Sequence, residues 1–120
     1  MANHALLSAS SSHRWLNCPP SARLCEGYDD KDSDFAAEGT DAHALCEYKL
    51  RKALGMEAND PTEALTWYNS EMEECANGYM AFVMELVEEA KKTCPDPVVL
   101  IEQRLDYSKY VEEGFGTGDC

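Results

Sequence analysis

The amino-acid sequence predicts an α+β fold in which helices come first and strands follow. Two long segments, 35–54 and 62–92, have apolar residues at helical spacings of three and four. A β-branched apolar run at 98–101 and three alternating glycines near residue 116 then predict two strands. With 120 residues, 44% of them hydrophobic, the chain is long enough for one small domain or for part of a larger one.

The first 33 residues predict two short helices followed by a loop. Serine hydroxyls at positions 8 and 10–12 are good N-caps, so a short helix is expected over 11–17. The Cys18-Pro19-Pro20 sequence ends it, because proline cannot continue a helix. A second helical turn is expected over 21–25, and the polar, acidic segment 27–33 is typical of a loop.

The segment 35–54 predicts the first long helix. Gly55 is a natural C-terminal stop, and 57–61 is interpreted as a linker. The apolar or small positions that define the helix recur at Ala36, Ala42/His43, Cys46 and Leu50.

A second and longer helix is predicted over about 62–92, opening at Pro61-Thr-Glu-Ala and ending before Pro95 and Pro97. Lys91 and Lys92 suit the negative end of its dipole. Its predicted buried stripe is Met72, Cys75/Ala76, Tyr79, Phe82/Val83, Leu86 and Ala90. Glutamates are expected on the opposite, solvated side, at positions 71, 73, 74, 85, 88 and 89.

The end of the chain predicts a β-hairpin. The run 98–101 is expected to be a buried strand that continues through 102–105. Glycines 114, 116 and 118, around Phe115, predict a turn and a second strand. Since an isolated hairpin is marginally stable, it should pack on the long helix or be joined by further strands.

Composition restricts the class of protein. No apolar run approaches the roughly 20 residues that span a bilayer, and the N-terminus has no signal-peptide pattern, so no membrane partner and a cytoplasmic location are expected. The six cysteines are irregularly spaced, which favours reduced thiols. The net charge of −13 argues against general binding to phosphate backbones. Residues 1–25, however, contain Arg14 and Arg23 and no acidic residue.

Candidate metal ligands occur in the first long helix and at the end of the chain. His43 and Glu47 are four residues apart, on one helix face, where they can bind a divalent metal or form an ordinary hydrogen-bonded pair. Gly39, one turn earlier, is expected to allow another segment to approach closely. Asp119 follows Gly-Thr-Gly and is either a ligand for Mg²⁺ or Mn²⁺ or an ordinary turn residue. Glu102 is either a third acidic group near the metal or a salt-bridge partner of Arg104.

Three motifs in this order resemble RecB-like nucleases of the PD-(D/E)XK superfamily, in particular a phage- and prophage-associated branch of exonucleases. The resemblance covers essentially the whole chain. It is carried by Leu7-Ser-Ala-Ser10 followed by Trp15-Leu-Asn-Cys-Pro19, by Gly39-x-x-x-His43-x-x-x-Glu47, and by Gly116-Thr-Gly-Asp119. It implies a restriction-endonuclease-like sheet, of which this chain holds the first strands, and a single nuclease domain that continues beyond residue 120.

The resemblance also implies a function, namely metal-dependent hydrolysis of DNA. His43 and Asp119 are then the ligands of Mg²⁺ or Mn²⁺, Glu47 is a supporting group and Glu102 is a neighbour. The side chains of His43 and Asp119 should therefore approach each other to about 5 Å. Cys18 occupies the place of the N-terminal ligand of an iron–sulfur cluster found in several such nucleases. Phage recombination or replication proteins are the implied partners, besides DNA itself.

The sequence departs from the family pattern in one respect. The family's E-x-K or D-x-K motif should follow Asp119 by about a dozen residues, and no such motif is present among the 120 residues. A chain of these residues is therefore expected not to cleave DNA by itself. Two alternatives stay open: an acidic helical module that binds another protein, and a non-catalytic relative that only binds DNA.

Overall fold

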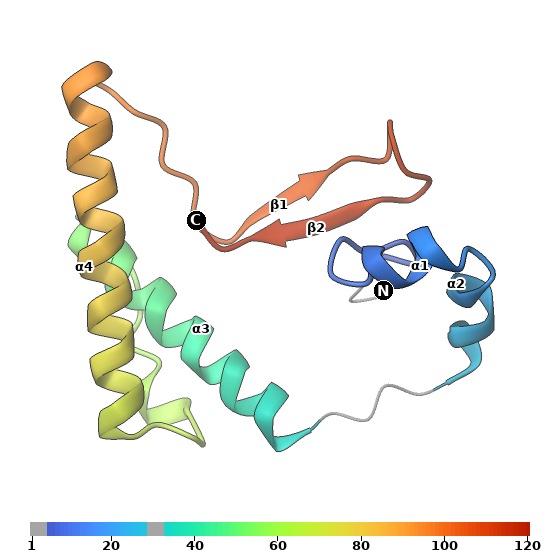
Figure 1. Ribbon diagram of the computed structural model, residues 1–120. Coiled ribbons are helices and arrows are strands. Elements are labelled where there is room, and N and C mark those ends of the chain that lie inside the picture. Colours follow the sequence, from blue (N-terminus) through green and yellow to red (C-terminus); the bar gives the residue numbers. More distant parts are fainter. Residues whose placement is uncertain (1–4, 29–32) are drawn as a thin grey trace. The chain divides into compact units, whose positions relative to one another are not determined.

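The computed structural model describes residues 5–28 and 33–120, which form an α+β structure (Figure 1). The helices are α1 (Ser12–Asn17), α2 (Ser21–Leu24), α3 (Asp34–Ala53) and α4 (Ser70–Thr93), with 3₁₀ turns at Cys25–Gly27 and Thr62–Ala64. The strands are β1 (Gln103–Asp106) and β2 (Phe115–Gly118). Two compact units emerge: a helical unit with the described residues 33–101 and 119–120, and a hairpin unit with 5–28 and 102–118.

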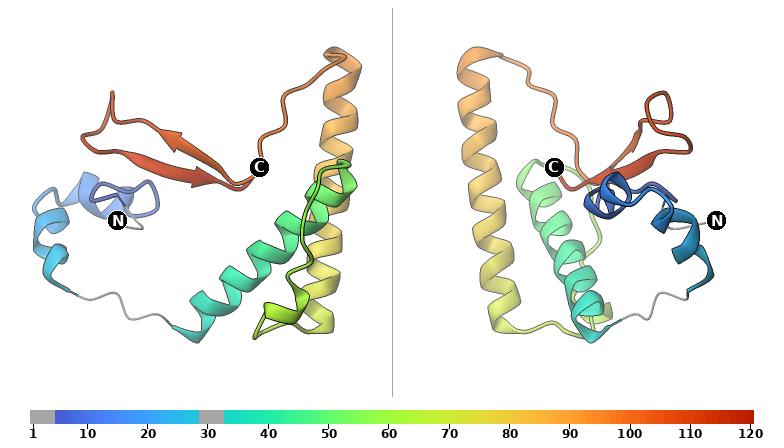
Figure 2. Two further views of the ribbon diagram at one scale, coloured as in Figure 1. Left: turned by 180° about the vertical axis from the view of Figure 1, so that it is seen from behind. Right: turned by 45° about the vertical axis from the view of Figure 1, so that its right-hand side comes forward.

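The helical unit is a pair of packed helices. α3 and α4 lie side by side in all three views (Figures 1 and 2). Their contact buries two apolar clusters, which consist of Leu45, Met72 and Ala76 in one case and of Leu50, Val83 and Val87 in the other. Leu45 and Leu50 are the most deeply buried large side chains of the described residues. None of the described helices has the length and apolarity needed to cross a membrane.

Helix α3 confirms the prediction for 35–54 to within one residue. Its N-cap is Ser33, whose hydroxyl accepts a hydrogen bond from the Ala36 N–H at 3.2 Å. At the other end, Gly55 has a φ of +76°, the left-handed conformation in which glycine commonly terminates a helix.

Helix α4 begins at Ser70, so the predicted start at residue 62 is wrong. Residues Thr62–Ala64 form only a 3₁₀ turn, after which Leu65 is extended. The N–H of Trp67 donates to the Asp41 carboxylate at 2.8 Å, and the Asn69 side chain caps the helix by accepting from the Met72 N–H at 2.8 Å. The helix therefore starts at the Asn69 cap, and Leu65, which precedes that cap, packs against the first apolar cluster.

The buried stripe of α4 is narrower than predicted. Met72, Ala76 and Val83 are buried as expected, and so is Val87. Phe82 and Leu86, however, are 60% and 48% exposed. The reason is that α3 contacts a single line of positions along α4, and Phe82 and Leu86 lie to one side of that line.

Residues 98–101 are not a strand, which corrects that prediction. The segment is extended without a ladder partner in the described part of the chain. Val99 and Ile101 pack against the cluster of Leu50, Val83 and Val87, whereas Val98 and Leu100 are 84% and 50% exposed. Alternate side chains of an extended chain point in opposite directions, so only one face of this segment lies on the helices.

The hairpin unit contains the expected second strand. β1 and β2 are antiparallel, with Gln103 opposite Gly118 and Asp106 opposite Phe115. The Tyr107 hydroxyl donates to the Phe115 carbonyl at 2.9 Å and closes the connecting loop. The Arg104 guanidinium lies 4.1 Å from the centre of the Phe115 ring, so Arg104 stacks on the strand opposite.

The N-terminal part of the hairpin unit agrees with the first predicted helix. α1 ends at Asn17, directly before the Cys18-Pro19-Pro20 sequence. Trp15 is held by a hydrogen bond from its indole N–H to the Ser8 carbonyl at 2.9 Å. The helical turn predicted over 21–25 is present as α2 followed by the 3₁₀ turn Cys25–Gly27. Gly27, which was predicted to begin a loop, therefore belongs to the 3₁₀ turn. Residues 29–32 of the predicted loop lie outside the described residues.

Candidate metal site

His43 lies on α3, and its imidazole projects from the surface of the helical unit. Its side chain is 60% exposed. Leu45 and Leu50, on the same helix, are held in the core against α4, which fixes the helix face that His43 occupies. The imidazole is therefore accessible and attached to the best-packed part of the unit.

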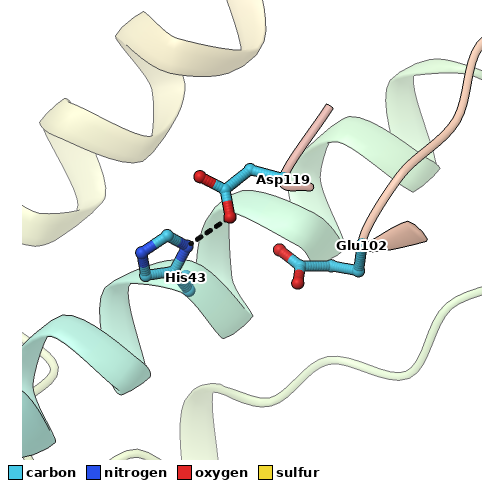
Figure 3. A group of neighbouring side chains, drawn as sticks. All are labelled: His43, Glu102 and Asp119. Carbon is cyan, nitrogen blue, oxygen red and sulfur yellow. Dashed lines mark ion pairs between the residues drawn. The ribbon is translucent and has the colours of Figure 1, made fainter. Parts of the chain in front are cut away.

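Asp119 directly follows Gly118, the last residue of β2, and meets His43. Its Oδ1 atom lies 3.4 Å from the His43 Nδ1 atom, and its side chain is 59% exposed (Figure 3). The expected approach of these two side chains is thus present, although they lie far apart in the sequence. An exposed ion pair of this length contributes at most about 1 kcal/mol.

Glu102 is the third side chain of the group. It follows Ile101, which packs in the core of the helical unit. One ligand atom from each of His43, Glu102 and Asp119 lies within 4.8 Å of the others, and the carboxylates point toward the imidazole (Figure 3). Glu102 has a φ of +48°, a left-handed conformation that is uncommon for residues other than glycine.

The donor set fits a hard or borderline divalent cation. Two ligand atoms bound to one ion at right angles, with bonds of about 2.1–2.2 Å, lie about 3 Å apart. The His43–Asp119 distance is close to that value. Two carboxylates suit Mg²⁺ and Mn²⁺, and an imidazole favours a transition metal, so Mn²⁺ is compatible with this combination.

Glu47 lies outside this group. Its Oε1 atom accepts from the Arg51 Nε atom at 2.8 Å, in an ion pair between residues four apart on α3. Acid followed by base at this spacing is the favoured orientation on a helix. Arg51 also donates to the Ile101 carbonyl at 3.5 Å, so Glu47 and Arg51 act on the segment that leads into Glu102 and not on the imidazole.

Gly39 and Arg104 also bear on the expectations about the site. Among the described residues nothing lies within 4 Å of an added Cβ at Gly39, so the predicted close approach of another segment is wrong for this part of the chain. Arg104, the alternative partner of Glu102, stacks on Phe115.

The cysteines are free thiols in the structure, and Cys18 is exposed at the C-terminal end of α1. Cys46, one turn after His43 on α3, is half-buried, as expected for one of the apolar positions that define the helix. Burial raises the pKa of the Cys46 thiol, and the nearby Cys75 and Asp119 raise it further. Cys46 therefore stays protonated at neutral pH, which makes it a poor metal ligand.

Comparison with known proteins gives a family but no structural relative. No solved structure matches the chain significantly. The family model described as "Protein of unknown function (DUF2800)" matches residues 4–120, which is nearly the whole sequence. The chain therefore belongs to the DUF2800 family.

Proposed function

We propose that this chain is the N-terminal portion of a metal-dependent DNA exonuclease and that it contributes His43, Asp119 and Glu102 as ligands for Mn²⁺ or Mg²⁺. The proposal rests mainly on one observation, the meeting of an imidazole and two carboxylates within 4.8 Å. The resemblance of the same motifs to RecB-like nucleases supports it.

Each residue has a separate task in this proposal. His43 offers a nitrogen from a rigid helix, and Asp119 and Glu102 offer two negative charges that offset the charge of a cation and a phosphate. A divalent ion held by these residues would supply Lewis-acid chemistry, polarising a phosphate and lowering the pKa of a water. The Glu47–Arg51 pair holds the Ile101 carbonyl and so positions Glu102.

No lysine of the described chain is assigned to catalysis. Lys49 pairs with Glu73, and Lys91 pairs with Glu88. Nucleases of this kind use a lysine to stabilise developing negative charge. We therefore expect the 120-residue protein to bind the metal without cutting DNA, and we expect cutting in a longer protein that adds an acidic-x-Lys strand.

The charge distribution indicates where DNA would approach. The whole chain has a net charge of −13, which opposes binding to phosphates. Arg14 and Arg23 are exposed on α1 and α2, in a segment that contains few acidic residues. We propose that DNA contacts this segment of the hairpin unit.

Metal binding tests the proposal directly. Titration of Mn²⁺ followed by electron paramagnetic resonance should show one site in the wild-type protein. His43→Ala and Asp119→Asn should each weaken binding at least tenfold, because each removes one ligand. His13→Ala and Asp96→Asn, which change exposed residues outside the group, are matched controls. Equal affinity in all five proteins would refute the assignment.

A nuclease assay with Mn²⁺ tests the second part. The 120-residue protein should leave single- and double-stranded DNA intact. Metal-dependent cutting that is lost in His43→Ala would show that the chain contains its own catalytic machinery, and the missing-lysine argument would then be wrong.

A further inference from the structure

Helix α4 has a second apolar face that α3 does not cover. Cys75, Phe82 and Leu86 are exposed and recur at spacings of seven and four, so they lie within a narrow arc of the helix. Phe82 and Leu86 are 60% and 48% exposed, whereas their neighbours Val83 and Val87 are buried against α3. Half-buried Tyr79 lies between the two faces.

One edge of this face is strongly acidic. At 100° per residue, Glu71 and Glu89 lie beside Phe82, and Glu85 and Glu74 follow farther around the helix. All four are exposed, and none forms an ion pair within the described part of the chain. By contrast, Glu88 on the far side of the helix pairs with Lys91. The exposed face is thus an apolar stripe bordered by unneutralised negative charge.

This combination restricts what can bind. The acidic border repels nucleic acid and anionic lipid surfaces. A second copy of the chain, with its net charge of −13, would bring the same acidic border against this one. A protein segment with apolar anchors and basic flanks satisfies both the stripe and its border.

We propose that the face formed by Cys75, Phe82 and Leu86, with its acidic border, binds a basic amphipathic helix of another protein. In this mode an apolar helix face docks at i, i+3/i+4 and i+7 positions, and Lys or Arg side chains meet the glutamates. Phe82 is the central anchor because it is more exposed than Leu86 and is aromatic. The inference goes beyond the metal site and does not depend on it.

A synthetic peptide tests the proposal. The probe is a fluorescein-labelled amphipathic helix of about 18 residues, built from leucine on one face and lysine on the other. Fluorescence anisotropy should show saturable binding that weakens as salt increases. A leucine–glutamate peptide with the same apolar face and a lysine–glutamine peptide with the same charge should both bind at least tenfold more weakly.

Variants locate the binding face. The double variant Phe82→Ser/Leu86→Ser should lose affinity for the leucine–lysine peptide by about tenfold or more. Phe35→Ser, which removes an exposed aromatic from α3, should not change it. Glu85→Gln/Glu89→Gln should weaken binding and flatten its salt dependence, whereas Glu57→Gln/Glu63→Gln should have a much smaller effect. Circular dichroism checks that each variant keeps its helix content.

Three outcomes would overturn the proposal. The first is equal binding by wild type and the Phe82→Ser/Leu86→Ser variant. The second is equal binding of the leucine–lysine and leucine–glutamate peptides. The third is self-association of the wild-type protein in analytical ultracentrifugation that disappears in the same double variant, which would make a second copy the occupant. Mn²⁺ binding should stay unchanged in all these variants, so the metal site is tested separately.

Discussion

At the scale of single residues, the conformation of Glu102 is the most informative feature of the site. A left-handed backbone costs a residue with a Cβ about 1–2 kcal/mol. Such strain persists where the surrounding structure holds the residue in place, and it is common at functional sites. In this chain the packing of Ile101 and the hydrogen bond from Arg51 hold the preceding residue.

Replacing Glu102 by glycine should separate backbone strain from metal binding. Glu102→Gly relieves the unfavourable conformation, which favours folding, and also removes the carboxylate, so Mn²⁺ affinity should decrease. Glu113→Gly is the matched control, since Glu113 has a φ of +55° in the hairpin loop, away from the metal site. It should gain similar stability and bind Mn²⁺ normally. Equal Mn²⁺ affinity in the two variants would exclude Glu102 as a ligand.

Two glycines should respond to alanine with opposite signs. A Cβ at Gly114 would lie 2.6 Å from the Tyr107 ring and 2.8 Å from the Val111 carbonyl oxygen, so Gly114→Ala should destabilise the protein by about 1–3 kcal/mol. Gly78 in α4 has open space at its Cβ, so Gly78→Ala should stabilise it by up to about 1 kcal/mol. Urea denaturation measures both free energies of unfolding. A stabilising Gly114→Ala would mean that the Tyr107 ring moves freely.

At the scale of secondary-structure elements, an ion pair joins α3 to α4. The Lys49 ammonium donates to the Glu73 carboxylate, which also accepts from the Tyr68 hydroxyl at 3.1 Å. The hydrogen bond from Lys49 is the main reason that the pKa of Glu73 lies below its ordinary value of 4.5. A carboxylate whose pKa is lowered by folding stabilises the folded state above the unfolded pKa, and this stabilisation is lost as the pH falls through the folded pKa.

The pH dependence of stability should reveal this pair. Glu73→Gln should melt at a lower temperature than the wild type at pH 7. The difference should shrink as the pH falls from 4.5 through the lowered folded-state pKa of Glu73, below which the wild-type carboxylate is also neutralised. Glu74→Gln, at the next and exposed position, is the control. A difference that persists unchanged at acidic pH would mean that the charge of Glu73 is not what stabilises the helix pair.

Local sequence signals predicted most element boundaries. Ser33 and Gly55 delimit α3, and Cys18-Pro19-Pro20 follows α1 directly. The start of α4 was misplaced because Thr62–Ala64 forms only a 3₁₀ turn and the Asn69 side chain caps the helix farther along the chain. The strand predicted at 98–101 is absent because strand formation requires a hydrogen-bonded neighbour, and propensity alone does not provide one.

At the scale of the whole molecule, a bound metal should fasten the end of the chain to helix α3. Asp119 and His43 are held by an exposed contact of 3.4 Å, which contributes little by itself. A cation that binds both residues in the folded state should add stability that increases with the logarithm of its concentration. Mn²⁺ should therefore raise the melting temperature, and chelation with EDTA should reverse the change.

The same experiment has an internal control. At an Mn²⁺ concentration about 100 times the dissociation constant, the expected stabilisation is about 2.7 kcal/mol. Asp119→Asn should show almost none of it, while Asp96→Asn should behave as the wild type. An equal increase in the melting temperature of both variants would point to metal binding elsewhere in the chain.

Helical periodicity, capping residues and glycine positions were enough to predict the α+β class, helix α3 and strand β2, because these depend on neighbours within a few residues. Residue type and position made His43, Glu102 and Asp119 candidate ligands, each with an ordinary alternative, and the resemblance to RecB-like nucleases implied that His43 and Asp119 bind the metal. Their meeting depended on the folded chain, since α3 and the end of β2 are distant in the sequence. The role of Glu47 also depended on the folded chain. Its spacing from His43 suggested a metal site, but its side chain pairs with Arg51 instead. Spacing along a helix defines which residues share a face, but the contacts around that face determine which of them interact.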